Sequence, residues 1–137
     1  MGKIQSQSTS NPTSFAQAGG LAALLGPKDF ERAMVAEFDL RRRRVTDLLN
    51  DIPGITCELP EGAFYAFANA AGVLGKSYQG TQVDNSGHLA DYLLREARIA
   101  VVPGNGFGLD THLRLSYATS MECIEEGLKR MQQALTS

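Results

Sequence analysis

Apolar residues recur at helical spacing in four segments of the chain. The pattern predicts helices over residues 13–25, 28–50, 86–97 and 121–135. In the last of these segments Ile124, Leu128 and Met131 recur every three or four residues, which places them on one helix face. Asn11 and Pro12 predict the start of the first helix, because Asn favours the capping position and Pro the first helical one.

Shorter apolar segments lie between glycines and prolines and have the length of strands. They predict strands over residues 55–59, 63–68, 99–102 and 112–117, and the Gly-punctuated stretch 70–84 is expected to be a loop. Strict alternation in the last strand puts Leu113 and Leu115 on one face and Arg114 on the other. The order of the elements predicts a small sheet with helices packed on it, an α+β domain.

Composition and charge exclude several classes of protein. The chain has 137 residues, of which 43% are hydrophobic, and a formal net charge of −2, which gives no general attraction to nucleic acid or anionic lipid. No apolar run reaches membrane-spanning length and residues 1–10 do not resemble a signal peptide, so we expect a cytoplasmic protein with Cys57 and Cys123 as free thiols. Four arginines at 41–44 have acidic neighbours and predict a solvated helix face with ion pairs.

Arg114 is the strongest candidate for chemistry. A guanidinium in an apolar strand is costly to bury without an anion, and Arg binds carboxylates through two parallel hydrogen bonds. A lone Arg at a strand end is more often exposed or in a structural pair. The glycine-rich segment 103–108 is expected to be a turn, since no clear helix follows it to complete a phosphate site. His88 and His112 lack metal-ligand spacing, so we expect no metal site.

Four motifs together resemble one family. They are residues 4–14 (IQSQSTSNPTS), 60–65 (PEGAFY), 98–104 (RIAVVPG) with Phe107-Gly108, and 113–118 (LRLSYA). In order and spacing they resemble class I, fold type I, pyridoxal-phosphate-dependent aminotransferases of the aspartate aminotransferase type, over nearly the whole chain. The resemblance implies that residues 1–26 are an end piece of the large cofactor-binding domain and 27–137 the small C-terminal domain.

The resemblance also implies a function, which is amino-group transfer between an amino acid and a 2-oxo acid in a homodimeric enzyme. It places Arg114 on the substrate α-carboxylate, Phe64 in the substrate pocket, and Ser8, Thr9 and Asn11 near the subunit interface and the neighbouring active site. None of the four lysines of this chain stands in the context of the family's cofactor-binding lysine. We therefore expect no catalytic residue and no bound pyridoxal phosphate in the chain alone, which should be inactive.

Two other interpretations remain open at this point. One is a stand-alone, non-enzymatic module that binds a carboxylic acid or a partner protein. The other is a related fold type I enzyme with a different outcome, such as a lyase or a prephenate-type aminotransferase. The sequence does not identify the preferred amino acid.

Overall fold

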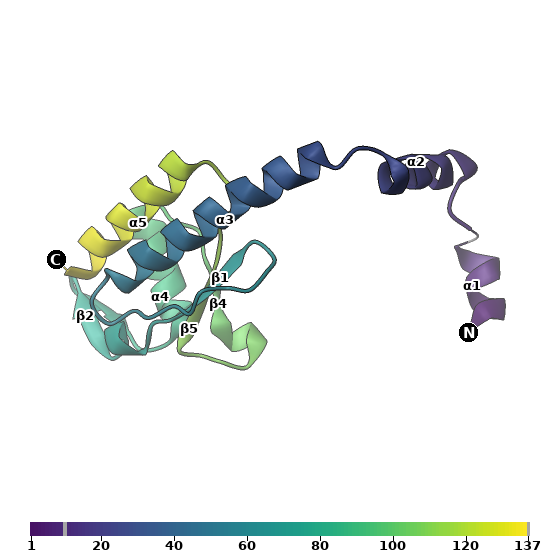
Figure 1. Cartoon of the computed structure of the whole chain (residues 1–137). Helices are drawn as coiled ribbons and strands as arrows, with labels where there is room; N and C mark the ends of the chain where they lie inside the picture. The colour runs from purple at the N-terminus through teal and green to yellow at the C-terminus, as the bar shows by residue number, and fades with distance from the viewer. Residues whose placement is uncertain (10, 137) are drawn as a thin grey trace. The chain divides into compact units, whose positions relative to one another are not determined.

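The computed structural model describes residues 1–9 and 11–136, and the contacts divide the chain into two units (Figure 1). The first unit is Met1–Met34 and the second begins at Val35. The predicted domain boundary between residues 26 and 27 concerns the architecture of a longer protein, which these contacts do not test. That boundary stays a prediction.

The first unit is helical. It contains α1 (Gly2–Ser8), α2 (Ser14–Leu25) and the first turns of α3 (Asp29–Asn50), and neither α1 nor α2 has a buried residue. The helices predicted over 13–25 and 28–50 are thus confirmed, whereas α1 was not predicted. The predicted cap is wrong, because Thr13 in an extended conformation is the N-cap of α2 and makes no side-chain capping bond.

The second unit holds the rest of α3 and the remaining elements. They are β1 (Tyr65–Asn69), the short helix η1 (Ala71–Val73), β2 (Lys76–Tyr78), β3 (Thr81–Val83), α4 (Ser86–Tyr92), the π-helical η2 (Leu93–Ala97), β4 (Val102–Pro103), the 3-10 turn η3 (Gly104–Phe107), β5 (His112–Ser116) and α5 (Met121–Thr136). Strands β1, β5 and β4 form an antiparallel sheet in that order, and β2 pairs with β3 in a separate hairpin. The central strand β5 therefore has a neighbour on each side.

One face of the three-stranded sheet belongs to the hydrophobic core. Ala66 and Ala68 of β1 and Leu113 and Leu115 of β5 are buried there. The helices contribute Val45, Leu49, Leu89, Leu93, Ile124, Leu128 and Met131 to the same cluster. In Figure 1, α5 lies beside the C-terminal half of α3, and the ion pair of Arg44 with Glu125 at 2.7 Å joins the two helices. The α+β prediction is confirmed.

The predicted strand over 55–59 is wrong. Only Thr56 forms a bridge, with Asn69 at the end of β1. The next residue, Cys57, bonds instead to the side chain of Asn50: its N–H donates to Asn50 Oδ1 at 2.8 Å, and Asn50 Nδ2 donates to its carbonyl at 3.0 Å. The amide at the end of α3 thus takes the place of a neighbouring strand.

The predicted loop over 70–84 is also wrong, since it contains η1 and the β2–β3 hairpin. Gln79 and Gly80 between these strands both have positive φ, at 49° and 83°, as a tight two-residue hairpin turn requires. Tyr78 anchors the hairpin by donating its hydroxyl to the Val73 carbonyl at 2.9 Å.

The other predicted elements of this unit differ mainly in extent. The strand predicted over 63–68 is observed as β1, starting two residues later, and the strand predicted over 99–102 is reduced to β4. The helix over 86–97 is confirmed as α4 continued by η2, and it is capped by Asn85, whose side chain accepts from the N–H of His88 at 2.9 Å. The strand and the helix predicted over 112–117 and 121–135 are confirmed as β5 and α5.

The predicted ion pairs of the four consecutive arginines are confirmed. Arg41 pairs with Glu37, Arg42 and Arg43 with Asp39, and Arg44 with Glu125. Both cysteines are free: Cys57 is buried, and burial raises the pKa of its thiol, while Cys123 is exposed. Within the described residues, no helix is long and apolar enough to cross a membrane and no group of three or more His, Cys, Asp or Glu side chains is arranged to hold a metal.

Candidate functional site

Arg114 projects from the central strand on the face of the sheet opposite the core. Its register partners are Phe67 on β1 and Val102 on β4. The guanidinium carbon lies 4.5 Å from the centre of the Tyr65 ring and 4.6 Å from that of Phe107. Both distances are within the range at which an aromatic ring attracts a cation. The two rings therefore hold one guanidinium.

The Nε atom of Arg114 is buried and, among the described residues, has no hydrogen-bond partner. Leaving a buried donor of a charged group without an acceptor costs free energy, so such a group calls for an explanation. A guanidinium presents parallel N–H donors that match the two oxygens of a carboxylate. The arrangement is chemically suited to gripping a carboxylate, and the placement of Arg114 on the substrate α-carboxylate stays a prediction.

Further rings extend this face on both sides of Arg114. Phe67 stacks on His112 at 4.9 Å and meets the edge of Phe107 at 5.9 Å. The centre of the Phe64 ring lies 4.3 Å from that of Tyr65, so Phe64 packs against a ring that contacts Arg114. Phe64 is 41% exposed and therefore accessible to a ligand. The two residues predicted to bind substrate, Arg114 and Phe64, thus both contact the Tyr65 ring.

The segment that carries Phe107 is fixed by contacts of its own. The Ser86 hydroxyl donates to Asp110 Oδ1 at 2.6 Å and accepts from the N–H of Asn105 at 3.3 Å. A side chain on Gly104 would come within 2.3 Å of the Leu109 carbonyl oxygen, so only glycine permits this close turn. The expected turn over 103–108 is confirmed, and it places the Phe107 ring 4.6 Å from the Arg114 guanidinium carbon.

An open hollow of about 730 Å³ borders the same face. Its lining comprises residues 56–61 together with Tyr65, Phe67, Asn69 and His112. The imidazole Nδ1 of His112 is 3.0 Å from the hydroxyl of its neighbour Thr111. The hollow thus lies beside Tyr65 and Phe67, and Arg114 itself is not part of its lining.

Ser8, Thr9 and Asn11 belong to the first unit. The hydroxyls of Ser8 and Thr9 each donate to a carbonyl of α1, at 3.0 Å, and Asn11 is exposed. Their predicted place near an interface stays a prediction, and Ser10 of the same motif lies outside the described residues.

The sequence reasoning missed Tyr65 and Phe107 as partners of Arg114. Alternation along 63–68 puts Tyr65 and Phe67 on the outward face, which was a usable signal. Which outward ring meets the guanidinium depends on the register, in which Tyr65 faces Ser116 and Phe67 faces Arg114. Phe107 comes from a separate loop, and no pattern in the sequence reports its approach.

Comparison with known proteins gives a consistent set of similarities. Residues 1–131 match the family described as aminotransferase class I and II. The chain is 46% identical to an aspartate aminotransferase of Rhizobium meliloti over 98% of its own length, and 45% identical to an aspartate/prephenate aminotransferase of Cereibacter sphaeroides over 96%. It spans about a third of these relatives, 33% in each case.

Solved structures agree. The crystal structure of the aspartate aminotransferase from Rhizobium meliloti superposes with a TM-score of 0.92 at 45% identity, covering 97% of this chain and 34% of that one. An aromatic aminotransferase from Pyrococcus horikoshii gives a TM-score of 0.81 at 33% identity, covering 98% of this chain and 34% of that one. The fold is therefore that of one part of these larger proteins.

Proposed function

We propose, from the premise that this chain belongs to the family of class I and II aminotransferases, that it is the C-terminal part of an aspartate-type enzyme. The whole enzyme would move an amino group between an amino acid and a 2-oxo acid. Family membership implies that it depends on pyridoxal phosphate. We further propose that it works as a cytoplasmic homodimer, and that residues 1–26 belong to its large domain and 27–137 to its small one.

The observation that carries the proposal is the state of Arg114. Its guanidinium is held between Tyr65 and Phe107, and its Nε is buried without an acceptor among the described residues. Amino acids and 2-oxo acids share one group, the α-carboxylate, which a single site can grip in both half-reactions. Arg114 would bind this carboxylate through two parallel N–H donors and so fix the orientation of the substrate's α-carbon.

We expect the cofactor's lysine to lie outside this chain, because none of the four lysines here stands in the family's lysine motif. Pyridoxal phosphate supplies an aldehyde and an electron-withdrawing ring, and enzymes hold it through a lysine amine. Lys28 Nζ contacts the Ala23 carbonyl and lies 3.2 Å from Glu31, and Lys76 Nζ donates to the Gly72 carbonyl at 2.7 Å. Within the described residues of the second unit, neither Lys76 nor Lys129 is among the contacts of the Arg114 guanidinium or lines the hollow beside Tyr65 and Phe67. The chain's own contribution is substrate binding.

The remaining predicted residues have supporting roles in this proposal. Phe64, half-exposed beside Tyr65, would line the substrate pocket. Ser8, Thr9 and Asn11 would lie near the neighbouring active site of the dimer.

The proposal is tested by replacing Arg114 in the whole enzyme. Arg114→Ala should raise KM for the amino acid about 30- to 1000-fold, because losing charge-assisted hydrogen bonds worth about 2–4 kcal/mol has that effect. Arg114→Lys keeps the charge without the paired donors and should fall between Ala and wild type. Cofactor absorbance should be the same in all three proteins. An unchanged KM in the Ala variant would refute the assignment.

A further inference from the structure

The turn that precedes β1 is followed directly in the sequence by two aromatic residues of the site. Residues 60–63 lead directly into Phe64 and Tyr65. Ala63 in this turn has a φ of 61°, in the left-handed region that residues with a Cβ disfavour. A backbone held in this conformation persists only when surrounding contacts fix it.

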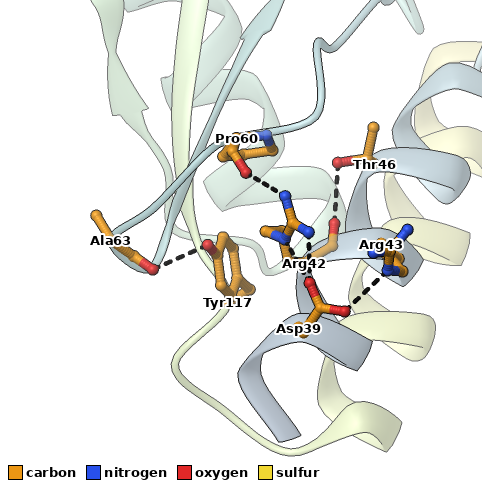
Figure 2. A network of polar contacts seen from close by, with 7 residues as sticks. All are labelled: Asp39, Arg42, Arg43, Thr46, Pro60, Ala63 and Tyr117. Carbon is orange, nitrogen blue, oxygen red and sulfur yellow. Dashed lines mark hydrogen bonds and ion pairs between the residues drawn. The ribbon is translucent and has the colours of Figure 1, made fainter. Parts of the chain in front are cut away.

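Two side chains from outside the turn hold it in place (Figure 2). Arg42 of α3 donates from Nη1 to the Pro60 carbonyl at 2.6 Å. Tyr117 donates its hydroxyl to the Ala63 carbonyl at 2.9 Å. Its backbone N–H donates to the Phe64 carbonyl, also at 2.9 Å. The backbone on both sides of the strained residue is therefore tied to a helix and to the end of β5.

Both anchoring side chains are themselves fixed. Arg42 Nε donates to Asp39 Oδ1 at 2.9 Å, its Nη2 contacts the same oxygen, and its own carbonyl accepts from the Thr46 hydroxyl at 2.9 Å. Hydrogen bonds from Arg43 and Arg42 lower the pKa of Asp39, so the carboxylate stays charged at neutral pH. Tyr117 is 1% exposed, and burial raises the pKa of its hydroxyl, which keeps the proton that it donates.

We infer that Arg42 and Tyr117 are positioning residues for the carboxylate site. They fix the turn at residues 60–63 and, with it, the position of the Tyr65 ring that follows. This ring in turn contacts one side of the Arg114 guanidinium. Neither residue touches the substrate, and each acts through Tyr65. This inference rests on the proposed function, because it concerns the same guanidinium.

Arg43 provides a matched control. It pairs with the same carboxylate, donating from Nε to Asp39 Oδ2 at 2.9 Å, but it does not contact the turn (Figure 2). Its side chain is 59% exposed, against 20% for Arg42. Arg42→Gln and Arg43→Gln therefore remove the same charge from the same helix, and only the first removes a bond to the turn.

The test uses the isotope-labelled 137-residue chain and follows the Arg114 Nε–H resonance by NMR, with succinate as the carboxylate probe. In wild type, the two rings should shift this proton upfield through their ring currents. Arg42→Gln and Tyr117→Phe should reduce the upfield shift and weaken succinate binding roughly three- to ten-fold, because a displaced ring orients the donors poorly. Arg43→Gln should match wild type in both measurements, and Arg42→Lys should recover part of the loss.

Each result has a separate meaning. If Arg42→Gln and Tyr117→Phe fold but leave the Arg114 resonance and the succinate affinity unchanged, the positioning role is refuted while carboxylate binding stands. Equal losses in Arg42→Gln and Arg43→Gln would also refute it, because a general effect of charge would then suffice. If wild type binds succinate no better than Arg114→Gln does, the proposed function itself fails. Thermal unfolding of every variant separates these outcomes from loss of fold.

Discussion

Phe107 should matter for ligand affinity more than for folding. Its ring is 49% exposed and lies 4.6 Å from the guanidinium carbon of Arg114. The turn that carries Phe107 is held by bonds that do not involve the Phe107 side chain, such as that between Ser86 and Asp110. Replacing it with Leu keeps an apolar side chain at this position and removes the aromatic face. The perturbation therefore isolates one of the two rings that hold the cation.

The size of the effect follows from the geometry. A guanidinium over a partly exposed ring gains about 0.5–1 kcal/mol, which corresponds to roughly a two- to five-fold change in a binding constant. The ring also contacts Phe67 edge-on at 5.9 Å, so some packing is lost as well. Since the side chain is half-exposed, we expect the free energy of unfolding to fall by less than about 1 kcal/mol.

The assay compares succinate affinity and urea unfolding for wild type, Phe107→Leu and Phe107→Tyr. The Leu variant should bind about two- to five-fold more weakly, and the Tyr variant, which keeps a ring, should bind like wild type. Unchanged affinity in the Leu variant would show that the ring does not support Arg114. An equal loss in the Tyr variant would point to disturbed packing rather than to the aromatic face.

Two further predictions concern stability. Arg98 ends η2 with a φ of 57°, so Arg98→Gly should stabilise the chain by about 0.5–1 kcal/mol, since relief of the left-handed strain exceeds the entropy that Gly adds to the unfolded state; a lower urea midpoint in this variant would contradict the reasoning. Burial raises the pKa of Tyr78, Tyr92 and Tyr117 above the usual value near 10. When the pKa of a group is higher in the folded state, its contribution to stability is fully present below about pH 10 and is lost as pH rises through the folded pKa. Urea midpoints should therefore fall as the pH is raised above about 10. A flat profile of urea midpoint against pH in that range would contradict this.

Local pattern was enough where burial follows sequence spacing. In β5 the alternation correctly separated Leu113 and Leu115, which are buried, from Arg114 on the other face. The same holds for α5, whose residues at helical spacing enter the core. In α2, by contrast, Phe15 remains 79% exposed within its unit, because an apolar stripe shows which face is able to pack and not what it packs against.

Errors arose where one side chain replaces a backbone partner or where a turn lacks the commonest residues. The segment 55–59 looked like a strand, but the Asn50 amide satisfies the backbone of Cys57. The β2–β3 hairpin turns at Gln79-Gly80, and Gln is not the usual Asn or Asp of such turns. Gly80, which follows Gln79 between Tyr78 and Thr81, was still a usable turn signal there.

The residues of the site fall into the same two groups: those that local pattern or a motif identifies, and those that depend on contacts distant in sequence. Arg114 was identified from its strand and from the family motif, and Phe64 from the motif alone. The sandwich of Tyr65 and Phe107 depends on strand register and on a loop held by Ser86 and Asp110, which lie 24 residues apart. The contact of Arg42 with the Pro60 carbonyl spans 18 residues, and nothing in the arginine run distinguishes Arg42 from its neighbours.

The central claim is that Arg114 binds a carboxylate, and a titration of the labelled chain with L-aspartate tests it most directly. Saturable shifts should be centred on the Arg114 Nε–H and the rings of Tyr65 and Phe107, and they should vanish in Arg114→Gln. Shifts that are absent from these groups in wild type, or that persist in the Gln variant, would contradict the account.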